Sequence, residues 1–167
     1  GASLDHVTAL RIGLGVDAHA FEQGRRLVLG GVTIPHESGL AGHSDGDVIA
    51  HALTDALLGA AGLGDIGALF PSEDQRYRGA DSLILLAEAY GHVRASGLRI
   101  VNADVVLIGQ EPRIAPYRDR MRERLATALA AERDVVNVRA TTTDRLGFTG
   151  RSEGLAAQAV ALLDAGC

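Results

Sequence analysis

The alternation of strand-like and helix-like segments along the chain is the feature that most limits its possible folds. Strands are predicted where β-branched residues cluster, at 10–16, 27–29, 32–34, 98–108 and 135–141. Helices are predicted where apolar residues recur every three or four positions, at about 45–61, 81–96, 117–129 and 153–165. Gly30-Gly31 between two short strands predicts a β-hairpin. This order predicts an α+β domain, in which helices cover a small mixed sheet.

Two of the predicted helices carry further information. The helix that begins near Ser44 or Asp45 has Ser44 as a suitable N-cap, and Gly62 is suited to end it. The last helix, Glu153 to Ala165, is almost entirely apolar. Burial on more than one side would explain this composition, either inside the domain or in an oligomer, and the sequence does not separate these two explanations.

Composition narrows the class of protein. The length of 167 residues suits one domain, which we place at 10–167, with residues 1–9 as a tag remnant or disordered leader. A net charge of −5 without a basic run argues against a nucleic-acid partner, and no apolar stretch is long enough for a membrane span. The single cysteine, Cys167, suits a reducing compartment such as the cytoplasm. All 16 basic residues are arginine, so any phosphate ligand must be held by arginine, backbone N–H groups or metal.

Asp17 and His19 are the first candidate metal ligands. They lie two positions apart at the end of a predicted strand, so their side chains project from the same face. A carboxylate and an imidazole placed in this way can bind one ion. The alternative is an aspartate that caps a turn beside an unrelated histidine.

A second polar cluster, His43 to His51, contains a third candidate ligand, His51. Asp47, His51 and Asp55 share one face of the predicted helix, so either aspartate is suited to orient the His51 ring. The alternative is a solvated polar face. Asp17, His19 and His51 together suit zinc, or manganese, iron or cobalt, and three protein ligands leave one coordination position for a substrate.

These motifs resemble those of the 2-C-methyl-D-erythritol 2,4-cyclodiphosphate synthases. The resemblance rests on motifs that occur in order: GVDAH at 15–19, HSDGDVIAH at 43–51, LGDIG at 63–67, LFP at 69–71, QEPR at 110–113 and ATTTDRLGFTGR at 140–151. It implies an enzyme of the non-mevalonate route to isoprenoids, a phosphorus–oxygen lyase. Such an enzyme converts 4-diphosphocytidyl-2-C-methyl-D-erythritol 2-phosphate into the cyclic diphosphate and CMP.

The resemblance also implies the assembly and the roles of individual residues. The family forms homotrimers with active sites shared between adjacent subunits, so we expect strands or helices to line a central axis. Zinc (or manganese or cobalt) is expected at Asp17, His19 and His51. Magnesium or manganese is expected on the substrate diphosphate, helped by Asp144, where the family has glutamate. The other implied residues are catalytic His43 and Thr142; substrate-binding Ser44, Asp65, Gly67, Phe70, Asp74, Phe148 and Arg151; and nucleotide-binding Gly109, Gln110, Glu111, Pro112, Arg113, Ile114, Ala115, Thr141 and Thr142.

Some positions depart from the pattern or match no motif. Ser72 and Glu73 replace residues that are usual in the family, so their substrate contacts are left open. His6, His36 and His92 are interpreted as surface residues. Two other functions remain under consideration: a metal-dependent phosphohydrolase, and a trimeric metal- and nucleotide-binding module without turnover. The chain is also compatible with being one half of a bifunctional protein.

Overall fold

A five-stranded mixed sheet forms the centre of the computed structural model, which describes residues 9–71 and 73–165. Its strands lie in the order β4-β1-β7-β5-β6. Only the pair β5 and β6 is parallel. The strands are β1 (Leu10–Gln23), β4 (Ser38–Leu40), β5 (Arg99–Ile108), β6 (Val136–Thr141) and β7 (Gly154–Asp164). The predicted hairpin is confirmed as β2 (Leu27–Leu29) and β3 (Val32–Ile34), which form a separate two-stranded sheet.

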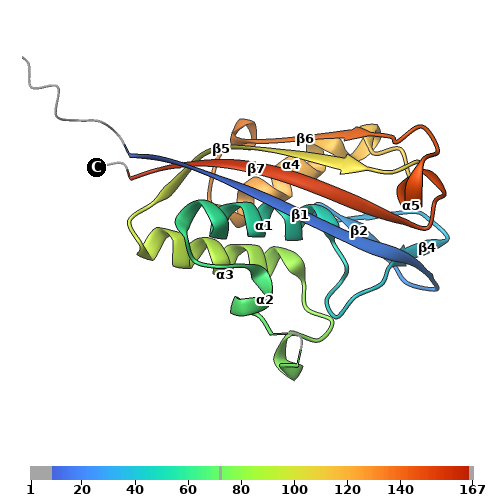
Figure 1. Cartoon of the computed structure of the whole chain (residues 1–167), viewed down its shortest axis with the longest axis horizontal. Coiled ribbons are helices and arrows are strands. Elements are labelled where there is room, and N and C mark those ends of the chain that lie inside the picture. Colours follow the sequence, from blue (N-terminus) through green and yellow to red (C-terminus); the bar gives the residue numbers. More distant parts are fainter. Residues whose placement is uncertain (1–8, 72, 166–167) are drawn as a thin grey trace, which may run out of the picture.

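Three long helices pack beside one another and cover one face of the sheet (Figure 1). Helix α1 (Val48–Ala61) lies directly against β1 and β7, α3 (Ser82–Ala95) packs on α1, and α4 (Arg118–Ala128) packs against β6. Short helical turns connect the larger elements: α2 (Ile66–Leu69), η1 (Gln75–Tyr77), η2 (Ala115–Tyr117), η3 (Arg133–Val135) and α5 (Gly147–Gly150). This arrangement confirms the expected mixed α+β fold.

Glycines in β1 bring α1 unusually close to the sheet. A Cβ atom at Gly15 would lie 1.9 Å from the Ala52 carbonyl oxygen, and one at Gly13 would lie 2.0 Å from that of Ala56. The helix backbone therefore rests on the strand backbone with no side chain between them. This contact sets the distance between β1, which carries Asp17 and His19, and the helix that carries His51.

The last element corrects the prediction of a C-terminal helix at Glu153 to Ala165. This segment is strand β7, which pairs antiparallel with β1 on one side and with β5 on the other. Its alanines and leucines have high helix propensity, but a central strand gains hydrogen bonds from two neighbours. Ala157, Ala159 and Ala161 are buried under the helices, where small side chains allow the close approach of α1.

Other boundaries shift by a few residues. Strand β1 extends to Gln23, so Asp17 and His19 lie within the strand rather than at its end. Helix α1 starts at Val48, and its N-cap is Asp47 instead of Ser44. Residues 1–9 were expected to be a tag remnant or disordered leader, and all of them except Ala9 lie outside the described residues. His6 and Ser72 also lie outside the described residues. No helix within the described ranges has the length and apolar character that a membrane span requires.

The sheet face opposite the helices is apolar, and no residue in the ranges 9–71 and 73–165 covers it. Leu10, Ile12, Leu14 and Val16 alternate along β1 on this face and are 55–73% exposed. Val160 of β7 pairs with Leu14 and is exposed as well. An exposed apolar patch of this kind on a globular domain usually marks an interaction surface.

Candidate active site

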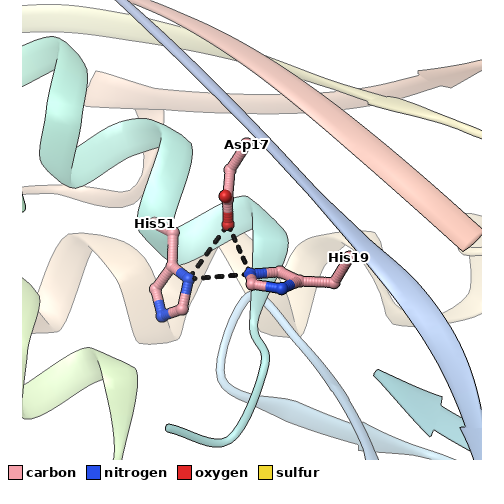
Figure 2. A group of neighbouring side chains, drawn as sticks. All are labelled: Asp17, His19 and His51. Carbon is pink, nitrogen blue, oxygen red and sulfur yellow. Dashed lines mark hydrogen bonds and ion pairs between the residues drawn. The ribbon is translucent and has the colours of Figure 1, made fainter. Parts of the chain in front are cut away.

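Asp17, His19 and His51 converge at the point where α1 crosses β1 (Figure 2). One carboxylate oxygen, Oδ2 of Asp17, lies 2.8 Å from Nε2 of His19 and 3.0 Å from Nδ1 of His51. The two ring nitrogens are 3.3 Å apart. These three residues form the only group of this kind found in the described part of the chain, with ligand atoms all within 4.8 Å of one another.

These distances fit a metal centre. Zinc binds nitrogen and oxygen ligands at about 2.0–2.2 Å, so two ligands at a tetrahedral angle lie roughly 3.3 Å apart. The three atoms already face one another at nearly this separation. The donor set of one oxygen and two nitrogens also suits zinc. The group is 9% exposed at His51 and somewhat more open at the other two residues, which leaves an approach for a further ligand.

The charges within the group are strongly coupled. Burial alone would raise the pKa of Asp17, but hydrogen bonds and positive charge from His19 and His51 lower it to about 2. Burial alone would lower the pKa of His51, yet its hydrogen bond with Asp17 and the nearby carboxylates raise it above 6.5. A carboxylate that stays ionised beside two imidazoles is suited to hold a divalent cation.

Asp47 holds the N-terminus of the helix that carries His51. Its carboxylate is fully buried and accepts hydrogen bonds from the backbone N–H groups of Gly30, Gly31 and Ala50 at 2.7–3.1 Å. Burial and the nearby charge of Asp45 raise the pKa of Asp47 to about 6. The carboxylate therefore joins the β2–β3 hairpin to α1.

The prediction that Asp47 or Asp55 orients the His51 ring is wrong. Asp47 bonds the hairpin, and Asp55 accepts a hydrogen bond from the backbone N–H of Ile66 at 2.7 Å. The contacts on the far nitrogen of His51, Nε2, come from two serine hydroxyls. Ser82 Oγ lies at 2.8 Å and Ser44 Oγ at 3.0 Å.

A cleft of about 330 Å³ opens beside the metal group. Its lining contains several residues that the sequence predicted together with others that it did not single out. The lining residues are Asp17, His19, His43, Ser44, His51, Ile66, Gly67, Phe70, Pro71, Glu73 and Leu85. The ring of His43 also contacts the backbone oxygen of Asp74 at 3.4 Å. We call this space the metal cleft.

Four predicted substrate residues lie outside the metal cleft lining. Asp65 caps α2 by accepting a hydrogen bond from Ala68 N–H at 2.8 Å, and the Asp74 carboxylate binds Arg76. Phe148 lies in α5 and is 42% exposed, and Arg151 pairs with Glu153 at 2.7 Å. Their roles toward substrate stay predictions.

A second cleft, of about 370 Å³, lies where β5 and β6 end. It is lined by Gly109, Gln110, Pro112, Arg113, Ile114, Ala115, Arg118, Ala140, Thr141 and Thr142. Most of these are the predicted nucleotide-binding residues, and we call this space the nucleotide cleft. Glu111 is absent from the lining and lies 3.6 Å from His36, which stacks on Phe21 and is partly buried rather than on the surface.

Arg118 is a lining residue that the sequence analysis missed. It is the first residue of α4, and a lone arginine at a predicted helix start gives no signal by itself. Asp144 adjoins the nucleotide cleft, because its carboxylate accepts a hydrogen bond from the Thr142 hydroxyl at 3.4 Å. It is not part of the metal group in this chain.

The two clefts share no lining residue within one chain. Asp17 on β1 is in register with Ala157 on β7, then Leu107 on β5, then Ala140 on β6. Three strand-to-strand steps of about 4.8 Å separate the backbones of Asp17 and Ala140, which line different clefts, by roughly 14 Å across the sheet. A single chain therefore presents a metal cleft and a nucleotide cleft as separate sites.

A helix-covered mixed sheet with a cleft beside an Asp-His-His group that could hold a metal ion is typical of an enzyme of the α+β class. The particular family follows from comparison: the chain belongs to the YgbB family, whose sequence pattern matches residues 10–164.

The relatives agree with this assignment. The chain is 61% identical over 154 residues to the 2-C-methyl-D-erythritol 2,4-cyclodiphosphate synthase of Moorella thermoacetica, covering 92% of this chain and 94% of the relative. The Rubrobacter xylanophilus enzyme of the same name is 60% identical over 157 residues, with the same two coverages.

Solved structures agree as well. A CDP-bound form of a synthase with this name has a TM-score of 0.84 and 42% identity, with 92% of this chain and all of that chain covered. The bifunctional IspDF of Campylobacter jejuni has a TM-score of 0.91 and 44% identity. In that case the match covers 94% of this chain but 42% of the longer one.

Proposed function

We propose that this chain converts 4-diphosphocytidyl-2-C-methyl-D-erythritol 2-phosphate into 2-C-methyl-D-erythritol 2,4-cyclodiphosphate and CMP, as a phosphorus–oxygen lyase of the non-mevalonate pathway. One observation carries the proposal. A chain 61% identical to a synthase of this name presents both a three-ligand metal group and a second cleft built from the predicted nucleotide residues.

The reaction is an intramolecular phosphoryl transfer. An oxygen of the 2-phosphate attacks the β-phosphorus, the bond from that phosphorus to the CMP oxygen breaks, and CMP leaves with the electron pair. The attacking oxygen is already anionic, so the protein needs no general base. Its main task is to fold the substrate so that its two ends meet, which can lower the barrier by roughly 7–11 kcal/mol.

The residues of the two clefts divide this task. The nucleotide cleft holds the cytidine and its phosphates through backbone groups of 109–115 and the hydroxyls of Thr141 and Thr142. In the metal cleft, His43 and Ser44 lie beside the metal group and are proposed to contact the transferring phosphate. Asp65, Gly67, Phe70 and Asp74 are proposed to border the erythritol unit.

Two cations complete the proposal. Asp17, His19 and His51 would hold a zinc ion, which would supply positive charge to stabilise the substrate phosphates. Asp144 would hold a magnesium ion on the diphosphate through water, because its side chain is one methylene shorter than glutamate and magnesium usually keeps several waters.

A homotrimer is part of the proposal and explains two features of the single chain. The uncovered apolar face of β1 and β7 offers a subunit interface around a central axis. Contact between subunits would also place the metal cleft of one chain against the nucleotide cleft of its neighbour. Phe148, which lies in α5, and Arg151, the C-cap residue of α5, are proposed to face substrate or the central axis. We further propose that residues 10–167 form one domain, which acts in the cytoplasm.

Incubation with the substrate, followed by phosphorus NMR, tests the reaction. The synthase produces the cyclic diphosphate and CMP, whereas a phosphohydrolase that shares the metal group produces linear phosphates. His51→Ala is expected to abolish turnover while CDP binding to the nucleotide cleft persists. A pure binding module would bind CDP and show no turnover even in the unaltered protein. Metal analysis of the purified protein identifies the ion.

A further inference from the structure

The nitrogen of His51 that faces away from the metal group has a partner that belongs to no predicted motif. Ser82, the first residue of α3, is fully buried, and its hydroxyl oxygen lies 2.8 Å from His51 Nε2. Behind Ser82 lies Asp45. One Asp45 oxygen accepts the Ser82 hydroxyl, and the other accepts the Ser82 backbone N–H at 3.0 Å. Asp45, Ser82 and His51 thus form a chain of contacts that ends at the metal group.

The available hydrogens fix the direction of this chain. A serine hydroxyl has one hydrogen and two lone pairs. The hydrogen of Ser82 is directed at the Asp45 carboxylate, which can only accept. The Ser82 oxygen therefore offers a lone pair to His51, and Nε2 must carry the hydrogen. A neutral imidazole carries one ring hydrogen, so with that hydrogen on Nε2 a metal ion would find a lone pair on Nδ1, which faces Asp17 and His19. Without the ion, the Asp17 carboxylate lies within hydrogen-bond distance of Nδ1 and competes for a hydrogen there.

We infer that Ser82 and Asp45 are positioning residues, which hold His51 in the tautomer that leaves Nδ1 free to bind metal. The inference deepens the proposed function and rests on its metal site. Histidine ligands commonly donate their second N–H to a group of the protein, which fixes the ring and strengthens metal binding. The second contact, from Ser44 Oγ, lacks such a carboxylate: that oxygen accepts a hydrogen bond from Gly46 N–H.

Burial makes the arrangement effective. Ser82 is shielded from solvent, so water does not compete for the His51 N–H. The backbone of Ser82 is held at the start of α3, where Asp81 is the N-cap. Asp45 is held in turn by the N–H of Asp47, which it accepts at 3.0 Å. The ring of His51 is therefore oriented by Ser82 at the start of α3 and, through Ser82, by Asp45 in the segment before α1.

Zinc affinity provides the first test. Ser82→Ala is expected to weaken zinc binding by about 10- to 100-fold, the usual cost of losing such a partner, in competition with a chromophoric chelator. Thr54→Val is the matched control. It removes a fully buried hydroxyl from α1, which donates to the Ala50 carbonyl at 2.7 Å and makes no hydrogen bond to Asp17, His19 or His51. Equal zinc affinity for Ser82→Ala and the unaltered protein would overturn the inference.

Nitrogen-15 NMR of the metal-free protein tests the tautomer directly and does not depend on zinc. His51 is expected to keep a hydrogen on Nε2 in the unaltered protein, although Asp17 Oδ2 lies 3.0 Å from Nδ1 and competes for a hydrogen there. Asp45→Asn preserves size but allows its amide to donate to Ser82, which turns the serine hydrogen toward Nε2. The population with the hydrogen on Nδ1 should then rise, as it should in Ser82→Ala.

The outcomes separate the two proposals. If the unaltered protein binds no zinc but shows the Nε2–H tautomer, which Asp45→Asn reverses, the metal site fails and the positioning role stands. A tautomer that is unchanged in Asp45→Asn overturns the positioning role, even if Ser82→Ala does not fold.

Discussion

Replacing Gly15 with alanine is a severe test of how the fold sets the metal group. The added Cβ would lie 1.9 Å from the Ala52 carbonyl oxygen and 2.7 Å from the Ala56 nitrogen, both in the backbone of α1. Ordinary contact begins at 3.4 Å, so the helix must retreat by about 1.5 Å. Ala52 adjoins His51, and Gly15 lies two residues before Asp17. The movement therefore falls directly on the ligands.

The expected loss is large for both stability and metal binding. Forcing extra volume into a packed core costs about 1–3 kcal/mol, and backbone contact puts this site at the upper end. For a chain of this size, about 3 kcal/mol lowers the melting temperature by roughly 6–12 °C. Metal–ligand distances tolerate about 0.2 Å, so a displacement of about 1.5 Å should abolish high-affinity zinc binding in Gly15→Ala.

Thermal melting by circular dichroism and chelator competition provide the two measurements. Gly59→Ala is the control in the same helix. Its added Cβ would meet only the Leu14 carbonyl oxygen, at 3.9 Å. Alanine in a helix is favoured over glycine by about 0.5–1 kcal/mol, so this variant should be as stable as the unaltered protein or slightly more so. If Gly15→Ala melts and binds zinc like Gly59→Ala, the close contact does not position the ligands.

Three further predictions concern pH, assembly and the nucleotide cleft. Zinc must displace any proton from His51, whose pKa is raised above 6.5 chiefly by Asp17 against the effect of burial. Affinity should therefore fall up to about tenfold per pH unit below that pKa, and a flat profile between about pH 5 and 8 would contradict this. Leu14 lies on the uncovered face, so Leu14→Lys should convert the trimer to monomers, as measured by light scattering. If the unaltered protein is already a monomer, the proposed interface is wrong. Arg118→Ala should weaken CDP binding by about five- to tenfold in calorimetry, roughly 1 kcal/mol for an exposed charge. Arg120 lines neither cleft, so Arg120→Ala should leave CDP binding unchanged. Equal losses of CDP affinity in the two variants would refute a specific role for Arg118.

The candidate metal ligands were the part of the site most accessible to sequence reasoning. Asp17 and His19 are two apart on a strand, and this local spacing alone places both side chains on one face. His51 joins them because the chain-long motif pattern links two segments that periodicity cannot connect. The residues of the nucleotide cleft were predicted in the same way, since most of them follow one another along the chain.

Contacts between distant segments were beyond this reasoning. Ser82 reaches His51 across 31 positions, and Arg118 enters the nucleotide cleft because α4 starts beside residues that follow β5. Asp47 shares a helical face with His51 in the sequence, yet it is an N-cap turned toward the β2–β3 hairpin. Tertiary packing determines such partners, and the local sequence around each residue does not indicate them.

The sequence alone determined the order of most elements and the hairpin, because these depend on short-range patterns of residue type. It also offered the three metal-ligand candidates, Asp17 and His19 through their local spacing and His51 through the chain-long motif pattern. Tertiary structure decided the state of Gly154–Asp164. Local propensity favours a helix there, but β1 and β5 offer hydrogen bonds on both edges and make it the central strand. It also decided the fit of α1 on Gly13 and Gly15, because a glycine marks a close contact only when the opposing backbone is in place.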